Sequence, residues 1–189
     1  MKKNLMIFSL ALIVGVAVGL MCPHGTGSGI LKTIEAREST RSFSTKPLDD
    51  KTTMEILWAA FGKNERGTRT IPTARNLQDL KVFAIRADGA FFYDGEKLNK
   101  VSDQDLRPLF AAAQPYVLDA PLTLVFAGTD KRWAPLHAGS AYQNVALYCV
   151  ERGIGNVVRG YFDAPGVERA LNLAKEEFAI ISQTIGYKK

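Results

Sequence analysis

Apolar and polar residues alternate along most of the chain with the periods of helices and strands. Between residues 54 and 61 the apolar positions recur at steps of three and four, which predicts a helix with one apolar face. Asp49 or Asp50 can cap the start of this helix, and Gly62 ends it. A longer helix of the same kind is predicted over 138–151, with a glycine as its natural stop.

Shorter apolar runs predict the strands. The segments 80–87 and 90–93 flank Asp88-Gly89, a pair that suits the tight turn of a β-hairpin. The uninterrupted apolar run 122–127 is typical of a central strand that is buried on both faces. The remaining expected elements are helices over 30–36, 103–113 and 165–173 and strands over 157–162 and 178–187. Together these elements predict an α+β fold in which helices flank a sheet.

The first 22 residues differ from the rest of the chain. Two lysines near the start precede 17 residues, 5–21, that carry no charge, which is typical of an export signal. Cleavage near Gly19 is the first choice for its processing. Lipid attachment at Cys22 is an alternative, although Met21 is larger than the residue that normally precedes such a site. Retention as a membrane anchor is another, since the run is near the shortest that spans a bilayer. We therefore expect an exported, periplasmic protein.

The rest of the chain reads as a linker and one domain. Residues 23–29 are rich in glycine and predict a flexible linker, and residues 30–189 form the folded domain. With 189 residues, of which 47% are hydrophobic and 23% charged, the composition is that of an ordinary globular protein. The net charge of +5 includes Lys2 and Lys3, and the other basic residues are scattered. This distribution argues against binding to nucleic acid.

Cysteine and histidine are scarce. The chain has two cysteines, too few for a disulfide framework, and Cys149 falls in an apolar helical stretch. We interpret Cys149 as a buried small hydrophobe, with a pair to Cys22 as the alternative. Neither His24 nor His137 has another ligand at a metal-binding spacing, so no metal site is predicted. The chain also lacks a Ser-His-Asp set, a carboxylate pair and a reactive cysteine motif, so we predict no catalytic side chain.

The most informative polar run is Arg37-Glu38-Ser39-Thr40-Arg41, which places two guanidinium groups and a hydroxyl directly after the first expected helix. Guanidinium groups suit phosphate oxygens, so the run is a candidate anion site. Taken alone, a solvated polar turn is the better interpretation. If the run does bind an anion, Glu38 and Thr40 alternate with the three ligands and should point away from it.

Further motifs along the chain change this balance. With the run 37–41 they resemble those of the FMN-dependent nitroreductase-like flavoproteins, including the thiazole and oxazole dehydrogenases of peptide maturation. The resemblance covers residues 30–187. The family's Arg-x-Ser-x-Arg/Lys motif, which binds the flavin phosphate and ribityl chain, stands here as Arg37, Ser39 and Arg41.

Two more motifs of the family follow in the expected order. The Pro-Ser-x-x-Asn-x-Gln motif stands as 72–78, at the end of a long polar loop, and implies that Asn76 and Gln78 contact the flavin. The family's Gly-x-x-x-Gln-Asn helix stands as 139–144 and leads to a Gly-Ile-Gly sequence. The resemblance implies that this helix lies at the core of a dimer, close to the cofactor.

The chain departs from the family where a Pro-x-Glu-Gly-Phe segment is usual. The corresponding residues 158–162 lack the acidic residue. A backbone N–H of Gly160 or Tyr161 can still face flavin N5, and Arg159 would add positive charge that stabilises the reduced flavin. Tyr161 and the aromatic residues 91–93 are also candidates for stacking on a substrate, but core packing is the favoured role for each.

The second departure is at the C-terminal end, where larger relatives carry Lys and Arg for the flavin phosphate. Here Lys188 and Lys189 take that role, or Arg37 and Arg41, with Arg75, hold the phosphate alone. The cofactor-binding residues that we predict are Arg37, Ser39, Arg41, Asn76, Gln78, Gly160, Tyr161 and Lys188.

The resemblance implies a mainly antiparallel sheet flanked by helices, a homodimer, and bound FMN. It also implies a ping-pong oxidoreductase in which flavin N5 carries the chemistry, with a nitroaromatic or quinone-like small molecule as acceptor. The donor is NAD(P)H or, because nicotinamides are cytoplasmic, an extracytoplasmic reductant such as a quinol or a redox protein. Two alternatives stay open: an exported flavin-binding electron relay with little turnover, and the same fold without flavin.

Overall fold

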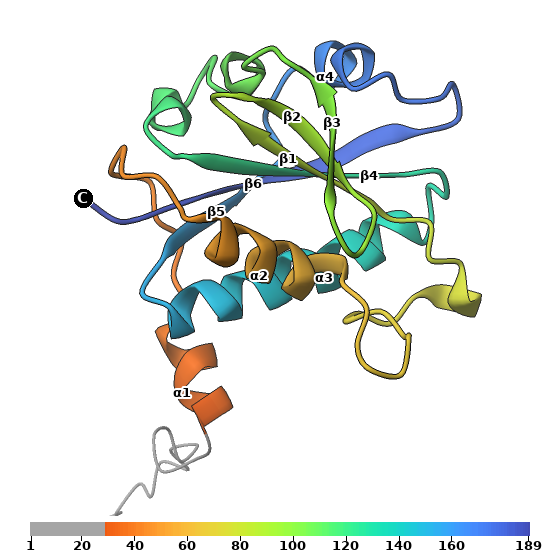
Figure 1. The fold of residues 1–189 in the computed structure, drawn as a ribbon, viewed down its shortest axis with the longest axis horizontal. Helices are drawn as coiled ribbons and strands as arrows, with labels where there is room; N and C mark the ends of the chain where they lie inside the picture. The colour runs from red at the N-terminus through yellow and green to blue at the C-terminus, as the bar shows by residue number, and fades with distance from the viewer. Residues whose placement is uncertain (1–28) are drawn as a thin grey trace, which may run out of the picture.

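The computed structural model of the protein describes residues 29–189, which form one six-stranded sheet with helices on both faces (Figure 1). The strands are β1 (Lys81–Arg86), β2 (Gly89–Tyr93), β3 (Leu98–Ser102), β4 (Leu122–Gly128), β5 (Gly155–Arg159) and β6 (Phe178–Gly186). The α-helices are α1 (Gly29–Ala36), α2 (Asp50–Phe61), α3 (Ala134–Glu151) and α4 (Ala164–Ala170). All neighbouring strands pair antiparallel in the order β3-β2-β1-β4-β6-β5, which confirms the predicted α+β fold.

The predicted export segment, with its alternatives at Gly19 and Cys22, lies outside the described residues. The same holds for the predicted linker except its last residue. Gly29 does not belong to a linker, because it is the first residue of α1. Within residues 29–189, no helix combines the length and the apolar character needed to cross a membrane.

The centre of the sheet agrees with the apolar pattern. β4 lies between β1 and β6, and all of its residues are buried. β1 and β2 form the predicted hairpin, but Gly89 pairs with Arg86, so the turn itself is at Ala87-Asp88. Gly89 has a φ of 137°, and a Cβ there would lie 2.4 Å from the Ser102 carbonyl oxygen on β3. This position therefore requires glycine.

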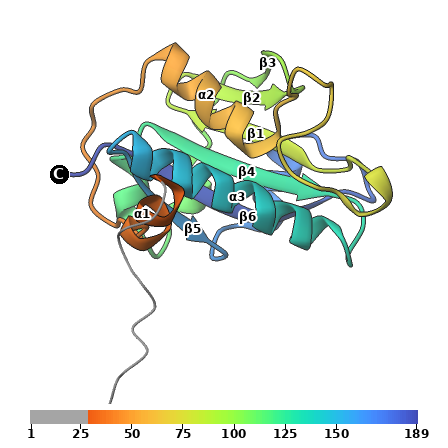
Figure 2. The ribbon, with the colours of Figure 1, turned by 90° about the horizontal axis from the view of Figure 1, so that it is seen from below.

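The helices form two layers around the sheet. α2 and α3 cover one face, and α4 and two short 3₁₀ helices cover the other (Figure 1). α2 packs along α3, as the view from below shows (Figure 2). One apolar cluster fills the space between this helix pair and the sheet, and a second fills the opposite side. Cys149 of α3 is fully buried in the first cluster, as predicted, and burial raises the pKa of its thiol.

The structure corrects the prediction in the segment after the hairpin. Instead of a helix over 103–113, it contains the 3₁₀ helices Arg107–Phe110 and Pro115–Leu118, and the strand β3 before them was not predicted. Pro108 would lie in the interior of a helix over 103–113, where the missing N–H and the proline ring disfavour an α-helix, whereas the first turn of a short 3₁₀ helix accepts it.

Several element boundaries also differ from the prediction, and α4 ends at Ala170 instead of residue 173. α3 begins earlier than expected, at Ala134, because Pro135 suits the first turn of a helix. β5 begins earlier than expected and ends at Arg159, before the predicted end at residue 162. Gly160 and Tyr161 therefore lie just beyond the sheet.

Candidate functional site

The predicted anion run lies along the outer edge of β5. The backbone N–H of Thr40 donates to the Asn156 carbonyl at 2.8 Å. The Thr40 side chain packs on Gly155, where a Cβ would lie 2.7 Å from the Thr40 methyl group. Thr40 thus points into the protein. The three candidate ligands of the run are all exposed: Arg37, Ser39 and Arg41.

Neither arginine of this run forms an ion pair within the described residues. Within residues 29–189, neither Arg37 nor Arg41 has a carboxylate oxygen within 4.0 Å. Ser39 places a hydroxyl donor between them in sequence. Two guanidinium groups that lack a protein partner, with a hydroxyl between them, match the chemistry of a phosphate dianion.

The C-terminal segment adds Lys188 to the same surface. Residue 43 forms a backbone bridge to residue 188, which places the two segments side by side. The Lys188 Nζ lies 2.6 Å from Glu38 Oε1, and this contact with Lys188 lowers the pKa of Glu38. Glu38 is therefore exposed and directed to the predicted phosphate ligand Lys188. Exposed ion pairs contribute little to stability, so Lys188 can exchange Glu38 for an anionic ligand.

Asn76 and Gln78 lie on a tightly bent part of the polar loop. A single 3₁₀ turn, Ala74–Asn76, is followed by residues that leave toward β1. Arg75, Asn76 and Gln78 all have positive φ angles, of 52°, 55° and 46°. The Gln78 side-chain amide donates to Asn76 Oδ1 at 2.9 Å and accepts from Arg69 Nε at 3.2 Å. The two predicted flavin contacts are thus linked to each other and to Arg69.

A buried histidine fixes this loop to α3, and sequence reasoning missed it. His137 Nε2 accepts the backbone N–H of Ala74 at 2.8 Å, and its Nδ1 lies 2.8 Å from Asp79 Oδ1. Because Nε2 is the acceptor, Nδ1 carries the hydrogen and donates to Asp79. The side chain of His137 is almost completely buried. No signal in the sequence could have paired residues 58 positions apart.

Within one chain the predicted ligands form two separate groups. The run 37–41 follows α1, which contacts the C-terminal end of α3 through Thr33 and Glu151. Asn76 lies at the N-terminal end of α3, beside His137. The 14 residues between His137 and Glu151 span about 21 Å at the α-helical rise. Figure 1 shows α1 and the C terminus at one end of α3 and the yellow loop of Asn76 at the other.

The end of β5 holds the remaining predicted ligands. Gly160 is exposed, and a Cβ added to it would meet no atom within 4 Å. The Tyr161 side chain is 65% exposed, so the favoured role of core packing was wrong for this residue. Core packing is correct for Tyr93, which is 3% exposed. Tyr161 is therefore free to contact a ligand or another protein chain.

Arg159 is directed into the protein beneath this segment. Its Nη2 donates to the carbonyls of Phe110 at 2.5 Å and Tyr161 at 3.2 Å, and its Nε donates to Gln114 Oε1. Nη1 has no hydrogen-bond partner within residues 29–189. Desolvation lowers the pKa of this guanidinium. Arg159 holds the backbone at Tyr161 and places a buried positive charge behind it.

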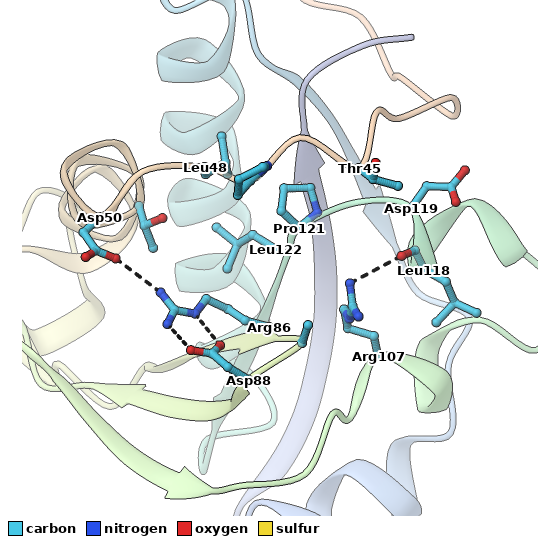
Figure 3. A pocket seen from close by; sticks show the side chains of 13 residues that line it. Thr45, Leu48, Asp50, Arg86, Asp88, Arg107, Leu118, Asp119, Pro121 and Leu122 are labelled. Atoms are coloured by element: carbon cyan, nitrogen blue, oxygen red, sulfur yellow. Dashed lines mark hydrogen bonds and ion pairs between the residues drawn. The ribbon is translucent and has the colours of Figure 1, made fainter.

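One well-formed hollow, of about 530 Å³, contains none of the predicted ligands (Figure 3). It lies between the start of α2, the β1–β2 turn and the start of β4, with Arg86 and Arg107 in its wall. Arg86 is held by Asp88, with both oxygens in contact, and lies 3.6 Å from Asp50. Arg107 binds Asp105 and two backbone carbonyls. Since both guanidinium groups are already paired, this hollow is a poor anion site.

No metal centre competes with this interpretation. Within the described residues, no three His, Cys, Asp or Glu side chains gather as metal ligands would. The exposed cationic groups of the run 37–41 and Lys188 are of the kind that can bind an anion such as a phosphate.

Comparisons with known proteins agree with the motifs. The nitroreductase family model matches residues 34–187. A Ralstonia eutropha protein of known structure, assigned to the nitroreductases, is 31% identical over 87% of this chain and 85% of its own, with a TM-score of 0.77. Among curated proteins, none matches the chain.

Two more distant structures share the fold. A chain of the Escherichia coli microcin synthetase complex, solved with truncated pro-MccB17 bound, is 19% identical and covers 100% of this chain and 79% of its own, with a TM-score of 0.75. An oxidoreductase that contains FMN is 16% identical and covers 83% of this chain and 76% of its own, with a TM-score of 0.61.

Proposed function

The chain belongs to the nitroreductase family, which makes it an FMN-dependent oxidoreductase, and we propose that two copies of the chain build each flavin site together. In this arrangement the run 37–41 and Lys188 of one protomer hold the flavin phosphate. Asn76 and Gln78 of the second copy contact the rest of the cofactor. The observation that carries the proposal is the separation of these two groups along α3, because a twofold axis perpendicular to α3 would place opposite ends of the two α3 helices side by side.

The phosphate end fits this role by its charge. Arg37 and Arg41 are exposed and lack a carboxylate partner among the described residues, and Lys188 is paired only with the exposed Glu38. A phosphate monoester offers up to three acceptor oxygens, which two guanidinium groups, the Ser39 hydroxyl and an ammonium group can satisfy. Arg75 lies at the other end of α3 and could join them only from the second copy.

The other end supplies fixed side-chain amides. Asn76 and Gln78 can each donate and accept hydrogen bonds, which suits the polar edge of a flavin ring. Arg69 and the His137 contact to Ala74 hold the loop, so these amides are oriented before the cofactor arrives. FMN supplies the redox chemistry once it is bound, and the chain supplies its binding and orientation.

The segment after β5 contributes backbone and charge. Gly160 leaves open space next to its backbone, which permits close approach of a planar ring. Arg159 lies behind Tyr161 as a buried cation. In a medium of low dielectric constant such a charge favours negative charge on a neighbouring ligand, and thus the reduced form of a flavin.

Exposed apolar side chains support the dimer. On α1, Ile30, Leu31 and Ile34 are 52%, 50% and 51% exposed, and at the other end of α3 Leu77 and Leu136 are 45% and 59% exposed. An interface that joins opposite ends of two protomers would bury both groups together.

The predicted export signal sets the electron donor within this proposal. An exported enzyme meets no cytoplasmic NAD(P)H, so a quinol or a partner redox protein is its donor, and a nitroaromatic or quinone-like compound is its acceptor. The electron-relay alternative differs only in turnover.

Sequencing the N terminus of the secreted protein distinguishes cleavage near Gly19, lipidation at Cys22 and a retained anchor, and an unprocessed cytoplasmic product would refute export.

A mixing experiment tests the shared site. One variant carries Arg37→Ala and Arg41→Ala, and the other carries Asn76→Ala, so neither should bind FMN alone. When equal amounts are unfolded together and refolded, half of the dimers are mixed and each mixed dimer has one intact site, so about a quarter of the sites should bind FMN. If each site lay within one chain, the mixture would bind none.

The control for this mixture is the wild type carried through the same refolding. It should recover full FMN binding and sediment as a dimer. A wild-type protein that binds FMN as a monomer would contradict the proposal. A folded protein that never binds FMN would refute the flavin site and support the alternative of the same fold without flavin.

A further inference from the structure

Trp58 is a large aromatic residue that α2 presents to solvent. Its side chain is 49% exposed, although it lies on a helix whose neighbouring residues Leu57 and Ala59 are buried. Trp58 lines two hollows. One, of about 400 Å³, lies toward α3, and the other, of about 530 Å³, lies toward residues 63–66. The loop that follows α2 begins at the gold end of that helix (Figure 2) and contributes residues to both hollows.

The indole of Trp58 is held in one orientation. Its Nε1 donates to the Lys63 carbonyl at 2.9 Å. Gly62 makes room for the ring, since a Cβ at that residue would lie 2.3 Å from the Trp58 Cδ1 atom. An exposed aromatic ring without a fixed orientation would lose side-chain entropy when it binds a ligand. Trp58 has already lost much of that freedom, which is the condition for a stacking platform.

The hollow toward α3 has apolar walls and a polar rim. Ala59, Leu147 and Tyr148 line it with Trp58, and Arg69 and Asn144 stand at its edge. The Asn144 amide donates to the backbone carbonyls of Ala59 at 3.3 Å and Thr70 at 3.2 Å. These bonds join the loop to both helices, so the walls of the hollow are fixed relative to one another. We name this space the indole hollow.

Arg69 gives the indole hollow its charge. Within residues 29–189 it has no carboxylate within 4.0 Å, and its neutral partners are the Phe61 carbonyl at 2.9 Å and Gln78 at 3.2 Å. The guanidinium lies 4.2 Å from the centre of the Phe61 ring. Gly95 permits this position, because a Cβ there would lie 2.3 Å from Arg69 Nη1. Asp94 and Glu96 act on this guanidinium only from a distance, so Arg69 is a cation without a direct ion pair among residues that line an aromatic hollow.

We propose that the indole hollow binds the electron acceptor, a planar aromatic ring that carries a carboxylate, with the ring on Trp58 and the carboxylate at Arg69. The inference rests on the proposed function, because Arg69 contacts Gln78, and Gln78 contacts Asn76, which faces the cofactor in that proposal. The group that is reduced is a nitro group on this ring: two electrons and two protons from the reduced flavin break one N–O bond, leave a nitroso group and release the oxygen as water. The contact through Gln78 places the acceptor next to the flavin site of the second copy.

The loop after α2, as well as Arg69, favours a negatively charged acceptor. Between residues 63 and 69 the loop carries three basic residues, Lys63, Arg66 and Arg69, and one acidic residue, Glu65. Lys63 also pairs with Glu96 at 3.0 Å. A neutral ring would gain from Trp58 but not from this excess of positive charge. Positive charge also argues against a cationic ligand on the indole.

Fluorescence measures binding at this residue directly, because the chain has two tryptophans, Trp58 and Trp133. In a full-length Trp133→Phe protein, prepared with and without FMN, para-nitrobenzoate should quench Trp58 to saturation. The neutral para-nitrobenzyl alcohol should bind several-fold more weakly. By calorimetry, Trp58→Leu should weaken para-nitrobenzoate binding about tenfold, the loss expected for an aromatic stacking contact.

The charge is tested with a matched pair on the same loop. Arg69→Gln should abolish most of the preference for the carboxylate over the alcohol, Arg69→Lys should retain part of it, and Arg66→Gln, which removes a more distant charge of the same loop, should reduce it clearly less than Arg69→Gln does. Thermal unfolding identifies any variant that fails to fold. In that case Trp58→Phe, which keeps an aromatic ring, replaces Trp58→Leu and should retain most of the affinity.

The outcomes separate this inference from the proposed function. Quenching without saturation, equal affinities for the acid and the alcohol, or unchanged binding by Trp58→Leu would overturn the acceptor site, whatever the FMN content. Saturable, charge-dependent binding to a protein that never takes up FMN would support the indole hollow and refute the flavin site.

Discussion

The Asp79 carboxylate and the His137 imidazole lie 2.8 Å apart, and the opposite nitrogen of the same ring accepts the backbone N–H of Ala74 at 2.8 Å. This pair connects the start of β1 and the loop of Asn76 to α3. The contact explains how three nearby residues with positive φ angles can be held in place, because a loop in that conformation needs support from the rest of the protein.

His137→Ala should lower the free energy of unfolding by about 2–3 kcal/mol, because it leaves a buried carboxylate and a backbone N–H without partners. Urea unfolding measures this change. Asp79→Asn keeps an acceptor oxygen for Nδ1–H and should cost less than about 1 kcal/mol. Equal losses in the two variants would show that charge, and not the hydrogen-bond chain, stabilises the loop.

Gly160→Val tests whether the flavin approaches the end of β5. A Cβ at this exposed residue would meet no atom of the described protein within 4 Å, so stability should change by less than about 0.5 kcal/mol. A ring that packs on this backbone would be displaced, and we expect FMN affinity to fall at least about tenfold, the effect of losing about 1.4 kcal/mol. Flavin absorbance after dialysis gives the readout. Normal FMN binding by a folded variant would remove Gly160 from the site.

Glu38→Gln should strengthen FMN binding by up to about fivefold, because Lys188 no longer has a protein carboxylate to exchange for the phosphate. The gain should shrink as salt is added, since salt screens exposed charges. Lys188→Ala serves as the reciprocal variant and should weaken binding. An unchanged affinity in both would mean that Arg37 and Arg41 hold the phosphate without Lys188.

Asp94 should make the free energy of unfolding depend on pH in the acidic range. Its carboxylate accepts the backbone N–H groups of Glu96 and Lys97 and the side-chain amide of Asn99, each at 2.9 Å. These bonds, with that to Lys97 the largest cause, lower its pKa from 3.8 to about 2. A lowered folded-state pKa means that the stabilisation is complete above the unfolded value of 3.8 and is lost as the pH falls to about 2.

Asp94→Asn should therefore be less stable than the wild type at neutral pH, and the difference should shrink between pH 4 and pH 2, the window set by the two pKa values. Thermal unfolding across this range measures it. A difference that stays constant with pH would show that Asp94 acts through its shape and not its charge.

The fold was largely predictable because local signals carried it. The apolar spacing of α2, the cap at Asp49 and the uninterrupted run of β4 all depend on neighbouring residues, and each is found where the pattern placed it. β3 was missed because its five residues, Leu98–Ser102, carry only two apolar side chains and lie at the edge of the sheet. An edge strand needs no buried face of its own to pair with β2.

The sequence identified the residues of the candidate site, but it did not show how they are arranged in space. Arg37 and Asn76 stand out as motif positions, and no local pattern indicates that α3 separates them. Trp58 was assigned to the apolar face of its helix because it fits the three- and four-residue spacing. Gly62 and Lys63 turn its ring to solvent instead, through a hydrogen bond that sequence spacing does not report.

The sequence by itself determined the order of most helices and strands, the family, and the chemical character of the ligands, because these depend on side-chain types and short-range spacing. Only the tertiary structure decided which of these residues meet. It turned Thr40 inward and Tyr161 outward, paired Glu38 with Lys188, and left the two groups of predicted flavin ligands at opposite ends of one helix. The physical reason is that contacts between distant segments follow from packing around the whole sheet, which no short stretch of the chain encodes.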